Sequence, residues 1–287
     1  MVLGPSLSAA KISARFVADL EPGILTVARI GAKARGAAQL GCIEGDIKAR
    51  VVLMCGRYVA AQDPAALVAE FEVAAPPERY LAPNYNIAPS SSVYIVVDKR
   101  LGDEPPVRSL EVATWGLVPS WAKDPVIGAK MTNARSETVA TKPSFRKAFA
   151  SQRCLVPADG YYEWFTSTQV TSSGRPAKLP FFIHAADDAT LAMAGLYEWW
   201  RSPDESWLLT CCVLTTQATH RLLQIHDRMP VMVPKDRWAW WLDSRTPVEV
   251  QPLLDPALVP LVAYPVSTAV NNARNSGPEL MQPLEAR

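Results

Sequence analysis

From residue 54 onward, apolar positions gather in short runs that are separated by turns containing proline and glycine. The clearest runs are SVYIVV at 92–97, FFI at 181–183 and LLTCCVL at 208–214. They are rich in β-branched and aromatic residues and are too short for typical helices. This pattern predicts β-strands at all three places.

Helical spacing of apolar residues is rarer. Residues 65–71 and 235–242 have the spacing and length of short helices. Thr246 before Pro247 predicts the capped start of a third helix, which Pro252 would cut short. Strands therefore outnumber helices and do not alternate with them regularly, which predicts an α+β fold.

Two segments differ from the rest of the chain. Residues 1–53 contain one aromatic residue and no tryptophan, and their charges interrupt any signal-peptide pattern. We predict a poorly structured extension at 1–53, absent from or removed in the active protein, and one domain over 54–287. Residues 166–180, rich in small and polar residues, predict an exposed hairpin loop, because strand-like sequence continues on both sides.

Charge and cysteine usage narrow the class of protein. The 287 residues include 29 Lys and Arg against 28 Asp and Glu, so any contact with nucleic acid must be local. Five cysteines, an odd and sparse set, favour a reducing cytoplasm over a disulfide scaffold. The sequence contains no Cys or His cluster with the spacing of metal ligands and no apolar stretch long enough to span a membrane. We therefore expect no metal, no cofactor and no membrane partner.

The candidate chemistry begins at Met54-Cys55-Gly56-Arg57-Tyr58, which alone is weak evidence because a lone cysteine is usually a small buried apolar residue. Further strings follow in order: NYNIAP at 84–89, WGLVPSW at 115–121, NARSET at 133–138, GYYEW at 160–164, IHDRMP at 225–230 and VSTAVNN at 266–272. Together they resemble the SOS-response-associated peptidase family, whose members process abasic sites in DNA. The resemblance runs from Met54 to about Pro283.

The resemblance implies a single domain with a mainly antiparallel or mixed sheet, a barrel-like core and short flanking helices. It also implies that Cys55, as the mature N-terminal residue, captures abasic sites in single-stranded DNA. An open abasic sugar carries an aldehyde, with which an α-amine forms an imine and a neighbouring thiol closes a thiazolidine ring. The amine titrates near pH 8 and the thiol near 8.5, so both reach reactive forms around neutral pH.

The resemblance implies roles for three further residues in the chemistry. Glu163 would be the general acid and base, because its aromatic neighbours make the apolar setting in which a carboxyl passes protons. His226 would assist ring opening and strand-cleaving or reversal chemistry, and Asn133 would bind the opened sugar.

Contacts to DNA are implied at five positions. Arg57 and Arg135 would hold phosphates, because a planar guanidinium suits phosphate oxygens. Trp121 would stack on bases or wedge between them, while Asn86 and Pro89 would shape the pocket wall. Some relatives carry a second aromatic residue where this chain has Ala122.

The remaining chemical residues have structural interpretations. Trp115 is expected in the core, and so are Cys211 and Cys212, because neighbouring side chains of a strand face opposite ways. His184 and His220 match no catalytic position and are interpreted as structural.

Three interpretations of function and three of the first 53 residues stay open at this point. Besides covalent capture, the chain could be a cysteine or N-terminal-nucleophile hydrolase of peptides or amides, or a noncovalent single-strand-binding module. Translation could begin at Met54, with the methionine then removed, or the extension could be cut off at the Met54–Cys55 bond. Alternatively the extension could remain and leave Cys55 without a free amine. We favour the start at Met54, and we expect a monomer.

Overall fold

The computed structural model describes residues 56–100, 102–170, 174–255 and 257–284. The predicted extension at 1–53 and the predicted nucleophile Cys55 lie outside these residues.

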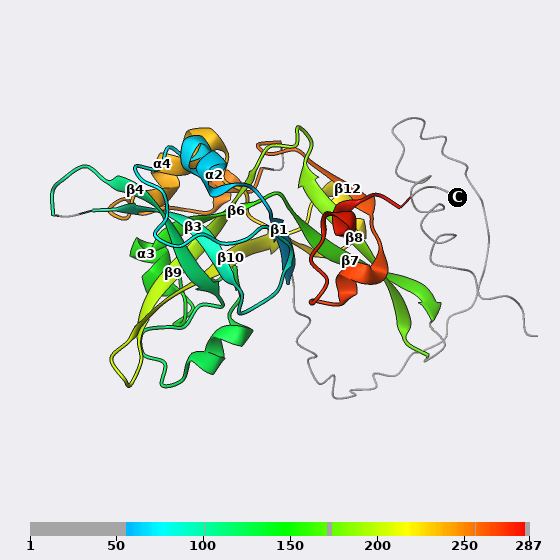
Figure 1. The fold of residues 1–287 in the computed structure, drawn as a ribbon, viewed down its shortest axis with the longest axis horizontal. Coiled ribbons are helices and arrows are strands. Elements are labelled where there is room, and N and C mark those ends of the chain that lie inside the picture. Colours follow the sequence, from blue (N-terminus) through cyan, green and yellow to red (C-terminus); the bar gives the residue numbers. More distant parts are fainter. Residues whose placement is uncertain (1–55, 101, 171–173, 256, 285–287) are drawn as a thin grey trace, which may run out of the picture.

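Five strands close a barrel in the order β10, β4, β3, β6 and β9, and β9 pairs with β10 again (Figure 1). The β10–β4 pairing is parallel and the other four are antiparallel. Two short strands, β5 and β11, also pair with β10. The bounds are β3 (Ser92–Lys99), β4 (Val107–Trp115), β5 (Asn133–Arg135), β6 (Arg153–Ala158), β9 (Leu191–Arg201), β10 (Trp207–Gln217) and β11 (Arg228–Pro230).

A second sheet, entirely antiparallel, lies beside the barrel in the order β12, β8, β7, β1 and β2 (Figure 1). The chain passes directly from the barrel into this sheet, since β6 ends at Ala158 and β7 begins at Gly160. The bounds are β1 (Arg57–Ala60), β2 (Asn84–Ile87), β7 (Gly160–Val170), β8 (Pro176–Ala185) and β12 (Leu261–Pro265).

Helices are few and short. The α-helices are α2 (Pro64–Glu70), α3 (Arg146–Ser151) and α4 (Trp238–Leu242). The 3-10 turns are η1 (Pro125–Lys130), η2 (His220–Gln224), η3 (Lys235–Arg237), η4 (Gln251–Leu253), η5 (Thr268–Asn271) and η6 (Pro278–Met281). The α+β class and the barrel-like core with flanking helices are therefore confirmed. In the part of the chain that the structure covers, no helix is long and apolar enough to cross a membrane.

Strand β3 is buried on both faces and joins the parts of the molecule. Ile95 packs in a cluster that also holds Tyr58 of the second sheet. Val96, facing the other way, belongs to the cluster under the helices, where the rings of Phe71 and Trp238 stack with centroids 4.4 Å apart. A strand that is buried on both faces has a nearly continuous apolar sequence, as residues 92–97 have.

The residues expected in the core are there. Trp115 is 1% exposed and donates its indole N–H to the carbonyl of Thr132 at 3.0 Å. Cys211 and Cys212 are fully buried in different clusters, as alternation along β10 requires. Burial raises the pKa of both thiols, so neither is a ready nucleophile.

Two predictions about local structure need correction. The helix expected from Thr246 does not form; the chain turns there and makes only the η4 turn. Tertiary bonds override the capping signal, since Thr246 donates its hydroxyl to Asp243 and its carbonyl accepts from Arg153. The predicted hairpin at 166–180 exists, but β7 and β8 extend into it, so most of the expected loop is strand.

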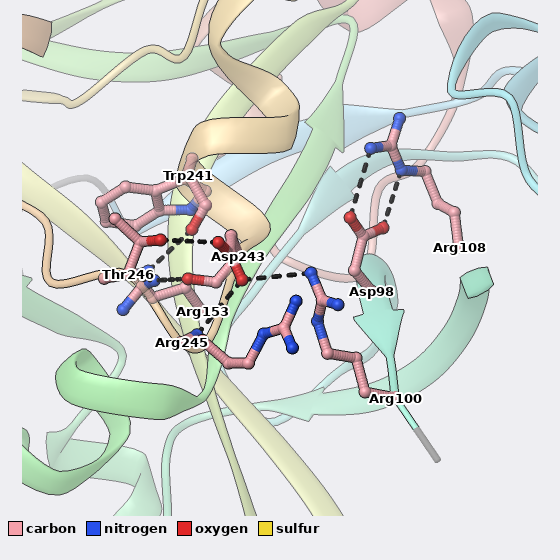
Figure 2. Close-up of polar contacts among 8 residues, drawn as sticks. All are labelled: Asp98, Arg100, Arg108, Arg153, Trp241, Asp243, Arg245 and Thr246. Carbon is pink, nitrogen blue, oxygen red and sulfur yellow. Dashed lines mark hydrogen bonds and ion pairs between the residues drawn. The ribbon is translucent and has the colours of Figure 1, made fainter. Parts of the chain in front are cut away.

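Arg153, at the start of β6, ties the helices to the barrel (Figure 2). Its side chain is buried and donates only to carbonyl oxygens of the backbone. The acceptors are Phe149 and Ala150 at 2.9 Å, Trp241 at 2.7 Å, Thr246 at 3.0 Å, and Asp243. These carbonyls belong to the ends of α3 and α4 and to the turn after α4, where helices leave acceptors unsatisfied.

Replacing Arg153 with methionine should lower the free energy of unfolding by about 3 kcal/mol, because several buried carbonyls lose a charged donor while the volume stays filled. Urea denaturation would measure the loss. The control Arg100→Met removes one ion pair to Asp243 and should cost below about 1 kcal/mol. Equal losses in both variants would contradict the role assigned to Arg153.

Candidate functional site

Glu163 is a buried carboxyl near the start of β7, and its side chain is 3% exposed. It pairs across the sheet with Phe181 on β8. Its Oε2 lies 3.9 Å from Nε2 of His226, so the structure brings these two predicted residues together although they are distant in sequence. The separation is longer than a direct hydrogen bond.

The imidazole of His226 is oriented by the backbone that follows it. The N–H of Arg228 donates to Nδ1 at 3.1 Å. In neutral histidine this bond makes Nδ1 the acceptor and assigns the proton to Nε2, the nitrogen facing Glu163. Asp227 lies 3.2 Å from Nδ1 and would accept a hydrogen bond whenever Nδ1 carries a proton. The arrangement suits proton exchange between His226 and Glu163.

Asn133 and Arg135 lie on β5, as the prediction that they share a face of an extended segment requires. Between them Ala134 is fully buried, whereas Arg135 is exposed and Asn133 partly so. The parallel register sets Arg135 opposite Thr215 of β10. Thr215 also pairs with Pro230 of β11, so one strand carries both the Asn133–Arg135 segment and the strand after His226.

Arg57, which is partly buried, and Asn86, which is buried, form a hydrogen-bonded hub with the C-terminal segment. Arg57 donates to Oδ1 of Asn86 at 2.7 Å and to the carbonyl of Val270 at 2.9 Å. The Asn86 amide nitrogen lies within hydrogen-bond distance of the carbonyls of Val270, Asn272 and Asn275. Burial lowers the pKa of Arg57, and the hub uses only part of its donors.

The register separates Arg57 from Glu163. Arg57 pairs with Tyr162 across β1 and β7, so its side chain leaves the same face as Tyr162. Glu163, the next residue of β7, faces the opposite way. The predicted site residues that lie on the second sheet therefore divide between its two faces.

Trp121 and Pro89, two of the residues predicted to contact DNA, both reach the surface. Trp121 is 60% exposed, which suits stacking better than packing, and Pro89 is partly buried. The loop that carries Trp121 starts at Gly116, where φ is +139° and a Cβ would lie 2.6 Å from the carbonyl of Gly128. Only glycine is accommodated there without strain. Trp200 holds the other end of the loop by donating to the carbonyl of Ala122 at 2.8 Å.

An ion pair that the sequence did not predict forms beside Thr215 of β10. Arg228 donates twice to Glu137, at 2.6 and 2.9 Å, and also to the carbonyl of Thr215 at 2.7 Å. It connects the segment after Asn133 and Arg135 to the segment after His226. Both partners lie in strings already noted, NARSET and IHDRMP, but nothing local in either string shows that they meet.

Side chains that could bind a metal ion do not cluster in the described part of the chain. No group of three or more His, Cys, Asp or Glu side chains there could hold a metal ion. His184 is held by Asp188 at 2.9 Å and stacks on Phe182, which fits the structural interpretation.

Comparison with known proteins gives the class of this fold and site. The sequence model of the family described as SOS response associated peptidase (SRAP) matches residues 54–273. The chain belongs to this family.

Named relatives agree with this assignment. The chain is 37% identical to abasic site processing protein YoqW of Bacillus subtilis (strain 168), over 80% of this chain and 99% of that protein. It is 30% identical to abasic site processing protein HMCES of Mus musculus, over 73% and 67% of the two chains. A crystal structure of a Bacteroides thetaiotaomicron protein has the same fold, with a TM-score of 0.67, 23% identity, and coverage of 80% of this chain and 100% of that one.

The Glu137–Arg228 pair should contribute to stability in a pH-dependent way. Its hydrogen bonds to Arg228 hold the pKa of Glu137 below its usual value of 4.5. A carboxyl with a lowered folded-state pKa stabilises above its unfolded value, and that stabilisation is lost as pH falls through the folded value. Because Glu137 is half exposed, the contribution at pH 7 should stay below about 1 kcal/mol.

Urea unfolding of the parent chain and of Glu137→Gln at pH 7 and at pH 3 would test this. The difference between them should shrink toward zero at the lower pH. The exposed residue Glu104, changed to Gln, is the control and should show no difference at either pH. A difference for Glu137→Gln that does not change with pH would contradict the pairing.

Proposed function

We propose that the chain processes abasic sites in single-stranded DNA by covalent capture through Cys55. The observation that carries the proposal is the buried Glu163 carboxyl beside His226, on the strand that pairs with the segment directly after Cys55. Relatives at 30–37% identity are named abasic site processing proteins, which supports DNA as the substrate.

Cys55 is joined by one peptide bond to Gly56, and consecutive Cα atoms are about 3.8 Å apart. Gly56 is buried and precedes β1, whose Arg57 lies opposite Tyr162. Carried one residue back, this antiparallel register would set Gly56 across from Glu163. In this proposal Cys55, one residue further back, would lie near the buried carboxyl.

The reaction that we propose is balanced and needs no cofactor. The free amine of Cys55 adds to the aldehyde carbon of the opened sugar and loses one water to give an imine. The thiol sulfur then bonds to the imine carbon, and its proton goes to the nitrogen, which completes the thiazolidine. Glu163 would protonate the departing oxygen and His226 would assist opening of the sugar ring. Both steps transfer protons, which Glu163 and His226 would supply and accept.

In this proposal the surrounding residues hold the DNA. Asn133 would hydrogen-bond the opened sugar, and Arg135 and Arg57 would contact phosphates. Trp121 would stack on an unpaired base, with Asn86 and Pro89 shaping the wall. The family's peptidase name would then describe release of the residues before Cys55, and strand cleavage at the abasic site would be a lyase activity of the same groups.

A chain that begins at Cys55 should form a heat-stable, gel-shifted product with a single-stranded oligonucleotide carrying one abasic site. Cys55→Ala should abolish the product while noncovalent binding persists, because the variant loses only the thiol. A chain that keeps residues 1–53 should not react, since its Cys55 nitrogen is in a peptide bond.

Intact mass of the protein made from its native gene would show whether Cys55 is exposed as the N-terminus. Folded protein starting at Cys55 that gives no covalent product would reject capture. A native-gel shift alone would then indicate a binding module, and turnover of a peptide or amide would indicate a hydrolase.

Glu163→Gln should slow crosslinking by about 10²- to 10⁴-fold, the usual contribution of a general acid or base, with little change in DNA affinity. Single-turnover rates at saturating oligonucleotide would measure it. Glu198→Gln is the matched control, because Glu198 is also a buried glutamate, 5% exposed, but lies in the barrel strand β9. Equal slowing in both variants would mean that Glu163 acts only through stability.

A further inference from the structure

A cavity of about 290 Å³ lies where α2, β2, the start of β3 and the β6–β7 turn meet. It shares no residue with the Glu163–His226 pair. Most of its wall is apolar and is formed by side chains such as Leu67, Ile87, Val93 and Pro157. A pocket of this size, with a mostly apolar surface and several polar groups, is typical of a small-molecule site.

The polar part of the wall is built around Asp159. One oxygen of this carboxyl accepts from the backbone N–H of Ala61 at 2.6 Å. Beside it, Gln62 donates to the hydroxyl of Thr190 at 2.6 Å, and that hydroxyl donates to Glu70 at 2.5 Å. All the hydrogen-bond donors in this network are therefore uncharged. The network ends at two carboxyl groups, those of Asp159 and Glu70.

No described lysine or arginine lines the cavity or lies within 4 Å of either carboxyl as an ion pair. Burial raises the pKa of Asp159, which is the effect expected of a carboxylate that lacks a compensating cation. The free energy cost of its charge would be recovered by a cation placed in the cavity. Charge complementarity therefore selects a positively charged occupant.

We propose that this cavity binds a small organic ammonium compound with an apolar, ring-sized body, whose ammonium group pairs with Asp159. A dry cavity of about 150 Å³ holds benzene. The larger volume here therefore has room for a two-ring body with a short amino-bearing arm. The site is separate from the proposed capture chemistry and does not depend on it.

Tryptamine and tryptophol form a matched pair of probes, since they share the indole body and differ in an ammonium against a hydroxyl. Calorimetric titration of the full chain should give saturable binding of tryptamine, at least about tenfold tighter than tryptophol, because hydrogen bonds to charged groups are the stronger ones. Asp159→Asn should weaken tryptamine about tenfold and leave tryptophol unchanged. Asp236→Asn, an exposed site elsewhere, is the control.

A second variant keeps the proposal testable if Asp159→Asn does not fold. Ala82 is an exposed residue of the cavity wall, and Ala82→Trp should block both probes. Absence of saturable tryptamine binding to the folded parent chain would overturn the proposal. Equal affinity for the two probes would also overturn it, because the cavity would then recognise only an apolar body.

Discussion

Strand β10 is the constraint on which the rest of the structure depends. It closes the barrel by pairing with β9 and β4, and its end pairs with β5 and β11. Asn133 and Arg135 lie on the first of these short strands, and His226 lies just before the second. A shift of β10 by one residue would turn every side chain of the strand to the other face and move both segments. The strand that closes the barrel therefore also sets the positions of these two segments of the polar site.

The second sheet supplies the other half of the site, and its geometry separates two tasks. Glu163 faces the barrel side, where it meets His226, whereas Arg57 leaves the opposite face and joins Asn86. One face of the sheet thus holds the groups suited to proton transfer. The other anchors the C-terminal segment through backbone carbonyls, with Asn86 as the shared partner.

Three charged side chains that are wholly or partly buried have different kinds of partner in this molecule. Arg153 is neutralised by backbone carbonyl dipoles at helix ends, and Arg228 by a carboxylate and a carbonyl. Asp159 has only neutral donors. Burying a charge is costly unless its partners compensate it. The partners of Arg153 and Arg228 provide this compensation, whereas Asp159 favours an added cation. This contrast distinguishes a structural charge from one that can receive a ligand.

The sequence by itself determined the strand-rich class, the strands around 92–97, 181–183 and 208–214, and the burial of Trp115. These features follow from local composition and from short sequence motifs, and neither depends on which distant residues meet in the fold. Tertiary structure decided that Glu163 meets His226, that Arg228 meets Glu137 across 91 residues, and that no helix starts at Thr246. The reason is physical: propensity acts over a few residues, whereas such contacts depend on strand register and on which buried donors need acceptors.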